Sequence, residues 1–180
     1  MAMCAIAAIV IALWFPRPVL GVLLAGLSLL WQVAAGLLVG GGLALGTLIG
    51  SRRPSQSGST RRMVENYGRL DLRGWNPLWI AMLAGFGEEL LFRGALQPLV
   101  GLWISSLLFV LVHARAYRFR KWDKATLAQA LGLLAMSIAL GLMARFAGLL
   151  TAMIAHAAID IAGLYAIRRA RIGMSAAPPA

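Results

Sequence analysis

Long apolar blocks, broken by short polar connections, run along the whole chain. They predict helical segments at about 1–15, within 19–50, and at 77–97, 99–114, 125–146 and 149–167. A single helix over 19–50 would reach about 48 Å at about 1.5 Å per residue. We therefore expect a bend or an early stop there, with Gly40-Gly41-Gly42 as the weakest point. Gly148 is predicted to form the turn between the last two segments.

Composition places these segments in a membrane. Hydrophobic residues make up 61% of the chain and charged residues 13%, against about 45–50% and about 25% in soluble domains. The fold class predicted is therefore all-α, a polytopic membrane helix bundle with about six transmembrane helices that forms a single domain over 1–180. The first segment lacks a charged start and a small-residue cleavage site, so we expect a retained span rather than a signal peptide.

The basic residues lie mainly beside the predicted spans. Connections 51–76 and 115–124 and the tail after 167 hold six, five and three of the seventeen Lys and Arg residues. With six spans, these regions and both termini lie on one side of the membrane, as the positive-inside rule requires. We expect a multi-pass protein of the cell membrane with both termini cytoplasmic. Its net charge of +11 then implies contact with anionic lipid head groups rather than nucleic acid.

Ionisable side chains nevertheless lie in otherwise apolar stretches of three predicted spans. They include both histidines of the chain and half of its six acids: Glu88, Glu89, Arg93, His113, His156 and Asp160. A charged group at the centre of a membrane helix costs roughly 2.5–3.5 kcal/mol. Convergence on one buried polar site is the simplest arrangement that satisfies all of them.

Helical spacing pairs several of these groups. Glu89 and Arg93 are four residues apart with the acid first, the favourable order for an ion pair. Glu88 faces another direction and has no cation at helical spacing, so it is the candidate general base. His156 and Asp160 are also four residues apart, which would let the carboxylate accept a ring N–H and orient the imidazole.

The set contains no serine or cysteine nucleophile, which favours activation of water. Glu88 with one histidine would deprotonate water, and the other histidine with Asp160 would stabilise an oxyanion. Glu88, His113 and His156 are also a ligand set for a divalent metal such as zinc, with one position left for water. Both routes hydrolyse an acyl bond, and the sequence leaves both open.

Three motifs in this order resemble a known family. They are Glu-Glu-x-x-x-Arg from Glu88 to Arg93, Phe-x-x-x-His from Phe109 to His113, and His-x-x-x-Asp from His156 to Asp160. Together, on apolar segments, they resemble the signature of the CAAX protease and bacteriocin-processing (CPBP) family of intramembrane proteases, which includes the type II CAAX prenyl endopeptidases. The resemblance covers about 77–168, the expected catalytic core.

The resemblance implies an intramembrane endopeptidase or metalloprotease that cleaves a peptide or protein segment at the bilayer. It assigns Glu88 and His113 to the water, and His156 and Asp160 to the oxyanion site. The supporting residues it implies are Glu89, Arg93 and Phe109. Asp160 stands where the prenyl-protease members have Asn. An ionised Asp cannot donate to an oxyanion, so Asp160 would act protonated or by orienting His156.

Two other classes of function compete with this interpretation. One is a non-enzymatic membrane partner, such as a bacteriocin-immunity or scaffold protein, which needs only the Glu89–Arg93 pair for packing. The other is a small proton-coupled transporter, whose groups would be strung along the membrane normal as a relay. A protease instead needs Glu88 and the two histidines to converge on a cavity that water can reach.

Overall fold

The computed structural model describes residues 2–15, 18–51, 64–67, 70–116 and 123–175. Regular secondary structure in these ranges is helical, apart from one isolated bridge between Gly26 and Gly148. The helices are α1 (Ala2–Trp14), α2 (Val19–Leu23), α3 (Leu29–Gly50), α5 (Asn76–Glu89), the π-helix η1 (Leu90–Leu96), α6 (Gln97–Ala116), α7 (Lys124–Phe146) and α8 (Leu149–Ser175). The predicted all-α membrane helix bundle is confirmed.

Among the described residues, four helical segments are long and apolar enough to cross a bilayer: Leu29–Gly50, Asn76–Ala114, Lys124–Phe146 and Leu149–Gly173. The second of these joins α5, η1 and α6 and contains a sharp break at Gly101, with φ 83° and ψ 168°. Helix α1 is apolar but has only 13 residues. The count of six spans therefore stays a prediction, as does the orientation of the termini.

The stretch 19–50 breaks at a different place from the one predicted. Helix α2 ends at Leu23 and α3 begins at Leu29. Gln32 stabilises the turn between them, because its Nε2 donates to Ala25 O at 3.2 Å and to Leu27 O at 2.9 Å. Gly40 lies inside α3, where a Cβ would come within 2.6 Å of Ala155 Cα in α8. The prediction of a weak point at 40–42 was wrong, because close packing on α8 keeps this part of α3 helical.

The expected helix end before Pro98 was also wrong. The helix continues through Pro98 and breaks at Gly101, where the positive φ favours glycine. A π-helix runs up to Leu96, and the N–H of Gln97 bonds to Phe92 O, five residues back. This altered hydrogen-bond pattern lies just before Pro98, whose missing N–H would break a regular α-helix. The turn predicted at Gly148 is confirmed, with φ 126°.

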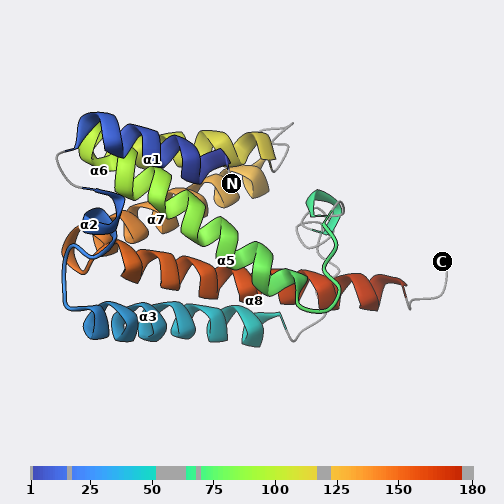
Figure 1. Cartoon of the computed structure of the whole chain (residues 1–180). Helices are drawn as coiled ribbons and strands as arrows, with labels where there is room; N and C mark the ends of the chain where they lie inside the picture. The colour runs from blue at the N-terminus through green and yellow to red at the C-terminus, as the bar shows by residue number, and fades with distance from the viewer. Residues whose placement is uncertain (1, 16–17, 52–63, 68–69, 117–122, 176–180) are drawn as a thin grey trace.

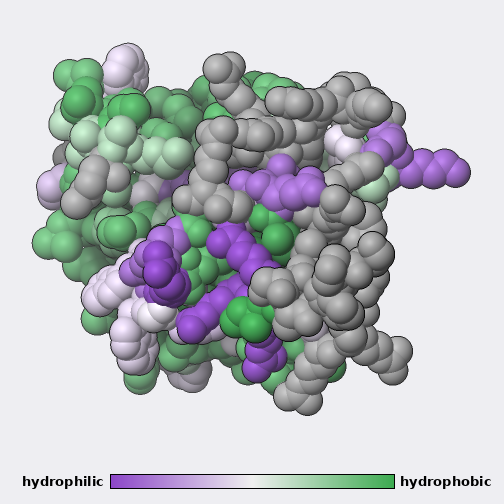
Figure 2. Space-filling view, turned by 90° about the vertical axis from the view of Figure 1, so that its right-hand side faces the viewer, coloured by the Kyte–Doolittle hydropathy of each residue, from purple (hydrophilic) through white to green (hydrophobic). Residues whose placement is uncertain are grey.

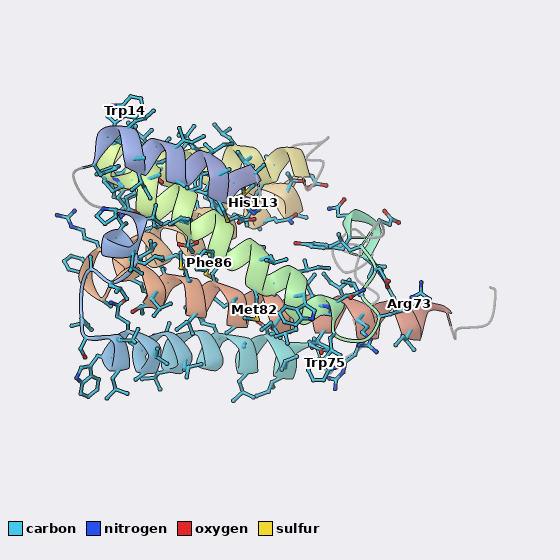
Figure 3. All side chains as sticks on the ribbon, viewed as in Figure 1. Trp14, Arg73, Trp75, Met82, Phe86 and His113 are labelled. Atoms are coloured by element: carbon cyan, nitrogen blue, oxygen red, sulfur yellow. The ribbon has the colours of Figure 1, made fainter. Side chains whose placement is uncertain are left out.

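Helix α8 lies along both α3 and α5, and α6 pairs with α7. In Figure 1, the end of α3, the start of α5 and the C-terminal half of α8 lie at one end of the bundle. Helix α2 and the turn between α7 and α8 lie at the other. Trp14 and Trp75 are exposed and lie at opposite ends of the bundle (Figure 3), as tryptophans at the two membrane interfaces do.

Candidate active site

The four predicted catalytic side chains come together from α5, α6 and α8. Glu88 Oε2 lies 3.5 Å from His113 Nε2 and 4.0 Å from His156 Nε2. Asp160 Oδ2 lies 3.6 Å from the same nitrogen of His156. Three helices therefore direct two imidazoles and two carboxylates toward one small region. The three segments meet because α5 and α6 are joined through η1 and α8 packs along α5.

Glu89 is the centre of a buried ionic network. Its Oε1 accepts the His156 Nδ1–H at 2.8 Å and lies 3.0 Å from Arg93 Nη1. The Glu89 side chain is fully buried and that of Arg93 nearly so. The predicted ion pair is present. The predicted i,i+4 contact between His156 and Asp160 is present, with Asp160 Oδ2 3.6 Å from Nε2. The hydrogen bond that orients the ring was predicted for the wrong carboxylate, because the buried Glu89 accepts the Nδ1–H.

Ser137 of α7 completes this network and was not anticipated. Arg93 Nη2 donates to Ser137 Oγ at 2.9 Å and to Ser137 O at 3.0 Å. The contact joins residues 44 positions apart in the chain. Ser137 had no charge and no motif to single it out. Its polar side chain in an otherwise apolar span was the only available signal.

Phe109 links the ionic network to His113. Its ring stacks on His113 with centroids 4.1 Å apart and an interplanar angle of 23°. The Arg93 guanidinium carbon lies 4.7 Å from the Phe109 centroid, within reach of a cation–π contact. Phe92 meets Phe109 edge-on at 5.1 Å. Of the predicted supporting residues, Glu89 therefore contacts His156, Phe109 contacts His113, and Arg93 contacts both Glu89 and Phe109.

Hydrogen bonds to the backbone and to Glu89 fix which ring nitrogens carry protons. His113 Nδ1 lies 2.9 Å from Phe109 O, and a carbonyl oxygen only accepts, so Nδ1 is the donor. His156 Nδ1 donates to the ion-paired Glu89 by the same argument. In the neutral form both rings therefore present the lone pair of Nε2 toward Glu88. Glu88 Oε2 is buried and makes no hydrogen bond to a described protein group.

The π-helix η1 carries Arg93 and follows directly on the two glutamates. A π-turn widens the helix locally, and such turns are frequent at functional sites. Here Leu90, Phe92, Gly94 and Ala95 of the same turn are buried, so η1 is packed on several sides. Nothing in the local sequence predicted it, because π-turns have no strong residue preference comparable to that of a cap or a β-turn.

The donor atoms match those that bind zinc, but their spacing matches only in part. Two ligand atoms of a tetrahedral zinc site, each at about 2.0–2.2 Å, lie about 3.3–3.6 Å apart. The His113–Glu88 distance of 3.5 Å fits this range, whereas the His156–Glu88 distance of 4.0 Å exceeds it. The described residues contain no group of three His, Cys, Asp or Glu side chains placed to hold a metal ion.

Solvent reaches the site from the side of Asp160. The Asp160 side chain is 36% exposed, whereas those of Glu88 and His113 are each 15% exposed and that of His156 is 8% exposed. Figure 2 looks onto the end of the bundle where the C-terminal half of α8 lies, and hydrophilic side chains there surround a patch of apolar surface. The polar groups are thus buried on the Arg93 side and accessible on the Asp160 side.

Comparison with known proteins adds a family assignment. A sequence model of the family described as type II CAAX prenyl endopeptidase Rce1-like matches residues 72–162, half of the chain. That range contains every site residue from Glu88 to Asp160. The protein named Uncharacterized protein YpbD of Bacillus subtilis (strain 168) is 39% identical over 84 residues, which cover 46% of this chain and 41% of the relative. The match therefore covers less than half of the length of this relative.

No solved structure matches the chain. The matched range, the order of the three motifs and the apolar helices that carry them agree with one another. This multi-pass membrane protein belongs to the Rce1-like family of type II CAAX prenyl endopeptidases.

Proposed function

We propose that the protein is an intramembrane endopeptidase that hydrolyses a peptide bond with water activated by Glu88 and His113. The observation that carries the proposal is the approach of Glu88 Oε2 to the Nε2 atoms of both histidines, at 3.5 Å and 4.0 Å. An ionised Glu88 and a neutral His113 present only acceptors toward one another. A water molecule that donates to them is the group that such a site binds best.

In the proposed reaction, Glu88 takes a proton from this water as the oxygen attacks the substrate carbonyl carbon. His113 accepts the second hydrogen of the water at Nε2 and so orients the attacking lone pair. Glu88 then transfers its proton to the leaving nitrogen as the carbon–nitrogen bond breaks. A positioned acid–base group of this kind contributes about 10²–10⁴-fold to the rate.

His156 is proposed to stabilise the oxyanion. When its Nε2 carries a proton, the ring is a cation that lies beside the Glu89 carboxylate at Nδ1 and near Glu88 and Asp160 at Nε2. Three carboxylates around one imidazole favour this positive charge, and its Nε2–H points into the region where Glu88 acts. Asp160 then contributes mainly through its negative charge rather than by donating a hydrogen bond.

The arrangement favours hydrolysis over the two competing functions. A packing role requires the Glu89–Arg93 pair but gives no reason for Glu88 and His113 to meet. A proton relay would place its groups in a file along the membrane normal. Here Glu88 Oε2 and Asp160 Oδ2 lie 4.0 Å and 3.6 Å from the same ring nitrogen, His156 Nε2.

Hydrolysis is tested with purified protein in liposomes and a set of membrane-anchored peptides, prenylated and unprenylated, in water enriched in ¹⁸O. Mass spectrometry of the products is expected to show a new carboxyl terminus that carries one heavy oxygen. The Glu88→Gln variant should lose at least about 100-fold in rate, while Asp71→Asn, a change of an exposed acid, should leave the rate unchanged. Cleavage by Glu88→Gln at the wild-type rate would refute the assigned roles.

The same assay after treatment with a chelator separates the two routes to activated water. The proposed route predicts that activity persists and that purified protein contains less than one metal ion per chain. Loss of activity that zinc restores, together with stoichiometric metal that Glu88→Gln no longer binds, would show that Glu88 is a ligand rather than the base.

A further inference from the structure

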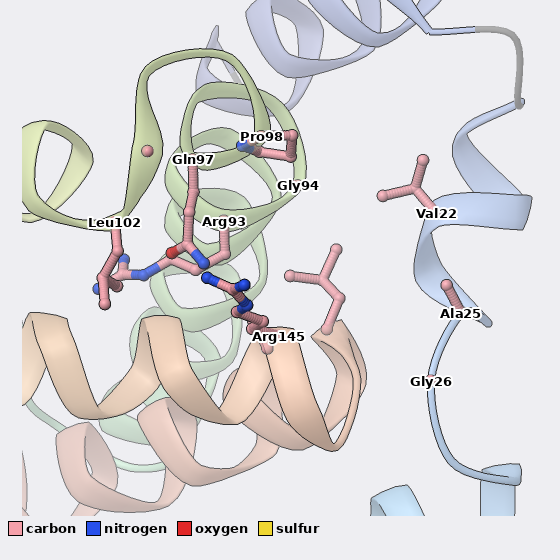
Figure 4. A pocket seen from close by; sticks show the side chains of 12 residues that line it. Val22, Ala25, Gly26, Arg93, Gly94, Gln97, Pro98, Leu102 and Arg145 are labelled. Carbon is pink, nitrogen blue, oxygen red and sulfur yellow. The ribbon is translucent and has the colours of Figure 1, made fainter.

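Helix α7 carries none of the predicted catalytic residues, yet two side chains one turn apart bond it to the helical segment of η1 and α6. Arg93 Nη2 donates to Oγ and O of Ser137, at 2.9 Å and 3.0 Å. Gln97 Nε2 donates to Gly141 O at 2.9 Å. Figure 4 shows the side chains of Arg93 and Gln97 directed toward α7. The donors are four residues apart and so are the acceptors, so the two contacts form successive rungs between the helices.

Small residues on α7 allow this close approach. A Cβ on Gly141 would overlap Leu102 and would come within 2.6 Å of Gln97 Oε1. Ser137 is fully buried and Arg93 nearly so. A buried guanidinium takes its hydrogen-bond acceptors from the protein, and Ser137 supplies two of them to Arg93, a hydroxyl and a backbone carbonyl.

A continuous series of short contacts leads from Ser137 to the imidazole of His156. Arg93 binds Ser137 through Nη2, and its Nη1 lies 3.0 Å from Glu89 Oε1. The same carboxylate oxygen accepts the His156 Nδ1–H at 2.8 Å. Because a guanidinium is rigid and planar, bonds that fix Nη2 also fix the direction of Nη1. Ser137 therefore restricts the Glu89 carboxylate and, through it, the orientation of the His156 ring.

We infer that Ser137 is a positioning residue for the proposed hydrolysis, which holds His156 Nε2 toward the oxyanion by way of Arg93 and Glu89. The inference rests on the proposed function and adds to it a residue outside the three motifs. Ser137 lies on the buried Arg93 side of the site, whereas solvent reaches the site from the side of Asp160. Its effect is therefore on the chemical step rather than on the binding of substrate.

Steady-state kinetics on a cleaved peptide in liposomes give the first test. Ser137→Ala removes the hydroxyl but keeps the backbone carbonyl, so Arg93 loses one of its two bonds to α7. We expect kcat to fall about ten-fold, as loss of one hydrogen bond to a charged group predicts, and KM to stay unchanged. Thr151→Val is the matched control, because it removes another buried hydroxyl, which donates to Gln32 O at 3.2 Å. It should leave kcat unchanged.

An NMR measurement without substrate tests the position of the ring directly. The chain has two histidines, so the His156 Nδ1–H signal of protein labelled with ¹⁵N-histidine is assigned by comparison with His113→Gln. A strong hydrogen bond to an ionised carboxylate moves this proton to low field and slows its exchange with water. Ser137→Ala should move the signal to higher field and speed the exchange, whereas Thr151→Val should do neither.

An unchanged kcat or an unchanged His156 signal in Ser137→Ala would overturn the inference. Equal changes in Ser137→Ala and Thr151→Val would also overturn it, since they would reflect a general loosening of the bundle. The two measurements separate this inference from the proposed function. If the wild type cleaves no peptide, the proposed hydrolysis is refuted, while a shifted His156 signal in Ser137→Ala alone would still show that Ser137 positions the ring.

Discussion

Replacement by Gln is predicted to have different effects at the two neighbouring glutamates. Glu89→Gln should lower the stability of the fold, whereas Glu88→Gln should abolish hydrolysis and leave the stability almost unchanged. Glu89 is fully buried, accepts the His156 N–H and pairs with the buried Arg93. Glu89→Gln keeps the volume of the side chain but leaves the Arg93 guanidinium without a counter-charge. Glu88→Gln, one residue away, removes a carboxylate that has no cation within ion-pair distance among the described residues, apart from protonated histidine.

The expected magnitudes follow from burial. Breaking a buried ion pair by removing one partner costs about 3–5 kcal/mol, which is roughly two to three and a half orders of magnitude in the unfolding equilibrium. Arg93 keeps its bonds to Ser137, so the lower half of this range is expected for Glu89→Gln. Glu88→Gln should change the free energy of unfolding by less than about 1 kcal/mol, although it abolishes hydrolysis.

The free energy of unfolding is measured by titrating the purified protein with SDS in mixed micelles and following the fluorescence of its six tryptophans. The double variant Glu89→Gln/Arg93→Met removes both charges together and should be less destabilised than the sum of its single changes. Equal stability of the two single glutamine variants, or strict additivity in the double variant, would refute the assignment of Glu89 as a structural counter-ion and of Glu88 as the reactive carboxylate.

Three further outcomes are expected. Protein labelled with ¹⁵N-histidine and purified without a histidine tag should give two imidazoles, His113 and His156, both protonated at Nδ1 when neutral; an Nε2-protonated ring at either position would contradict the hydrogen bonds described above. Asp160→Asn should slow hydrolysis by no more than roughly five-fold, since a partly exposed ion pair is worth at most about 1 kcal/mol; a loss comparable to that of Glu88→Gln would make Asp160 a catalytic group. Gly148→Ala should lower the thermal unfolding midpoint by several degrees, because φ is 126° and a Cβ would overlap Gln32 Oε1, whereas Gly41→Ala, with open space around it, should not.

Motif order and helical spacing were sufficient to predict that the ionisable side chains of three spans lie together. Glu88, His113 and His156 stand out in sequence because ionisable groups are costly in apolar spans, and their convergence is the arrangement that offsets this cost. The i,i+4 rule also correctly predicted the Glu89–Arg93 pair. The same rule predicted that Asp160 approaches His156, which it does at 3.6 Å. It did not predict that Glu89, on another helix, makes the hydrogen bond to Nδ1 of that ring, because local spacing carries no information about neighbouring helices.

The sequence by itself determined that this chain is a membrane helix bundle with one polar site, since composition and charge placement are properties of residues alone. Only the tertiary structure decided that Glu89 orients His156, that Ser137 holds Arg93, and that the helix changes to a π-helix beside the glutamates. It also placed the breaks at 24–28 and Gly101. These features depend on contacts between helices far apart in the chain, and packing between them outweighs the local preferences that a sequence pattern records.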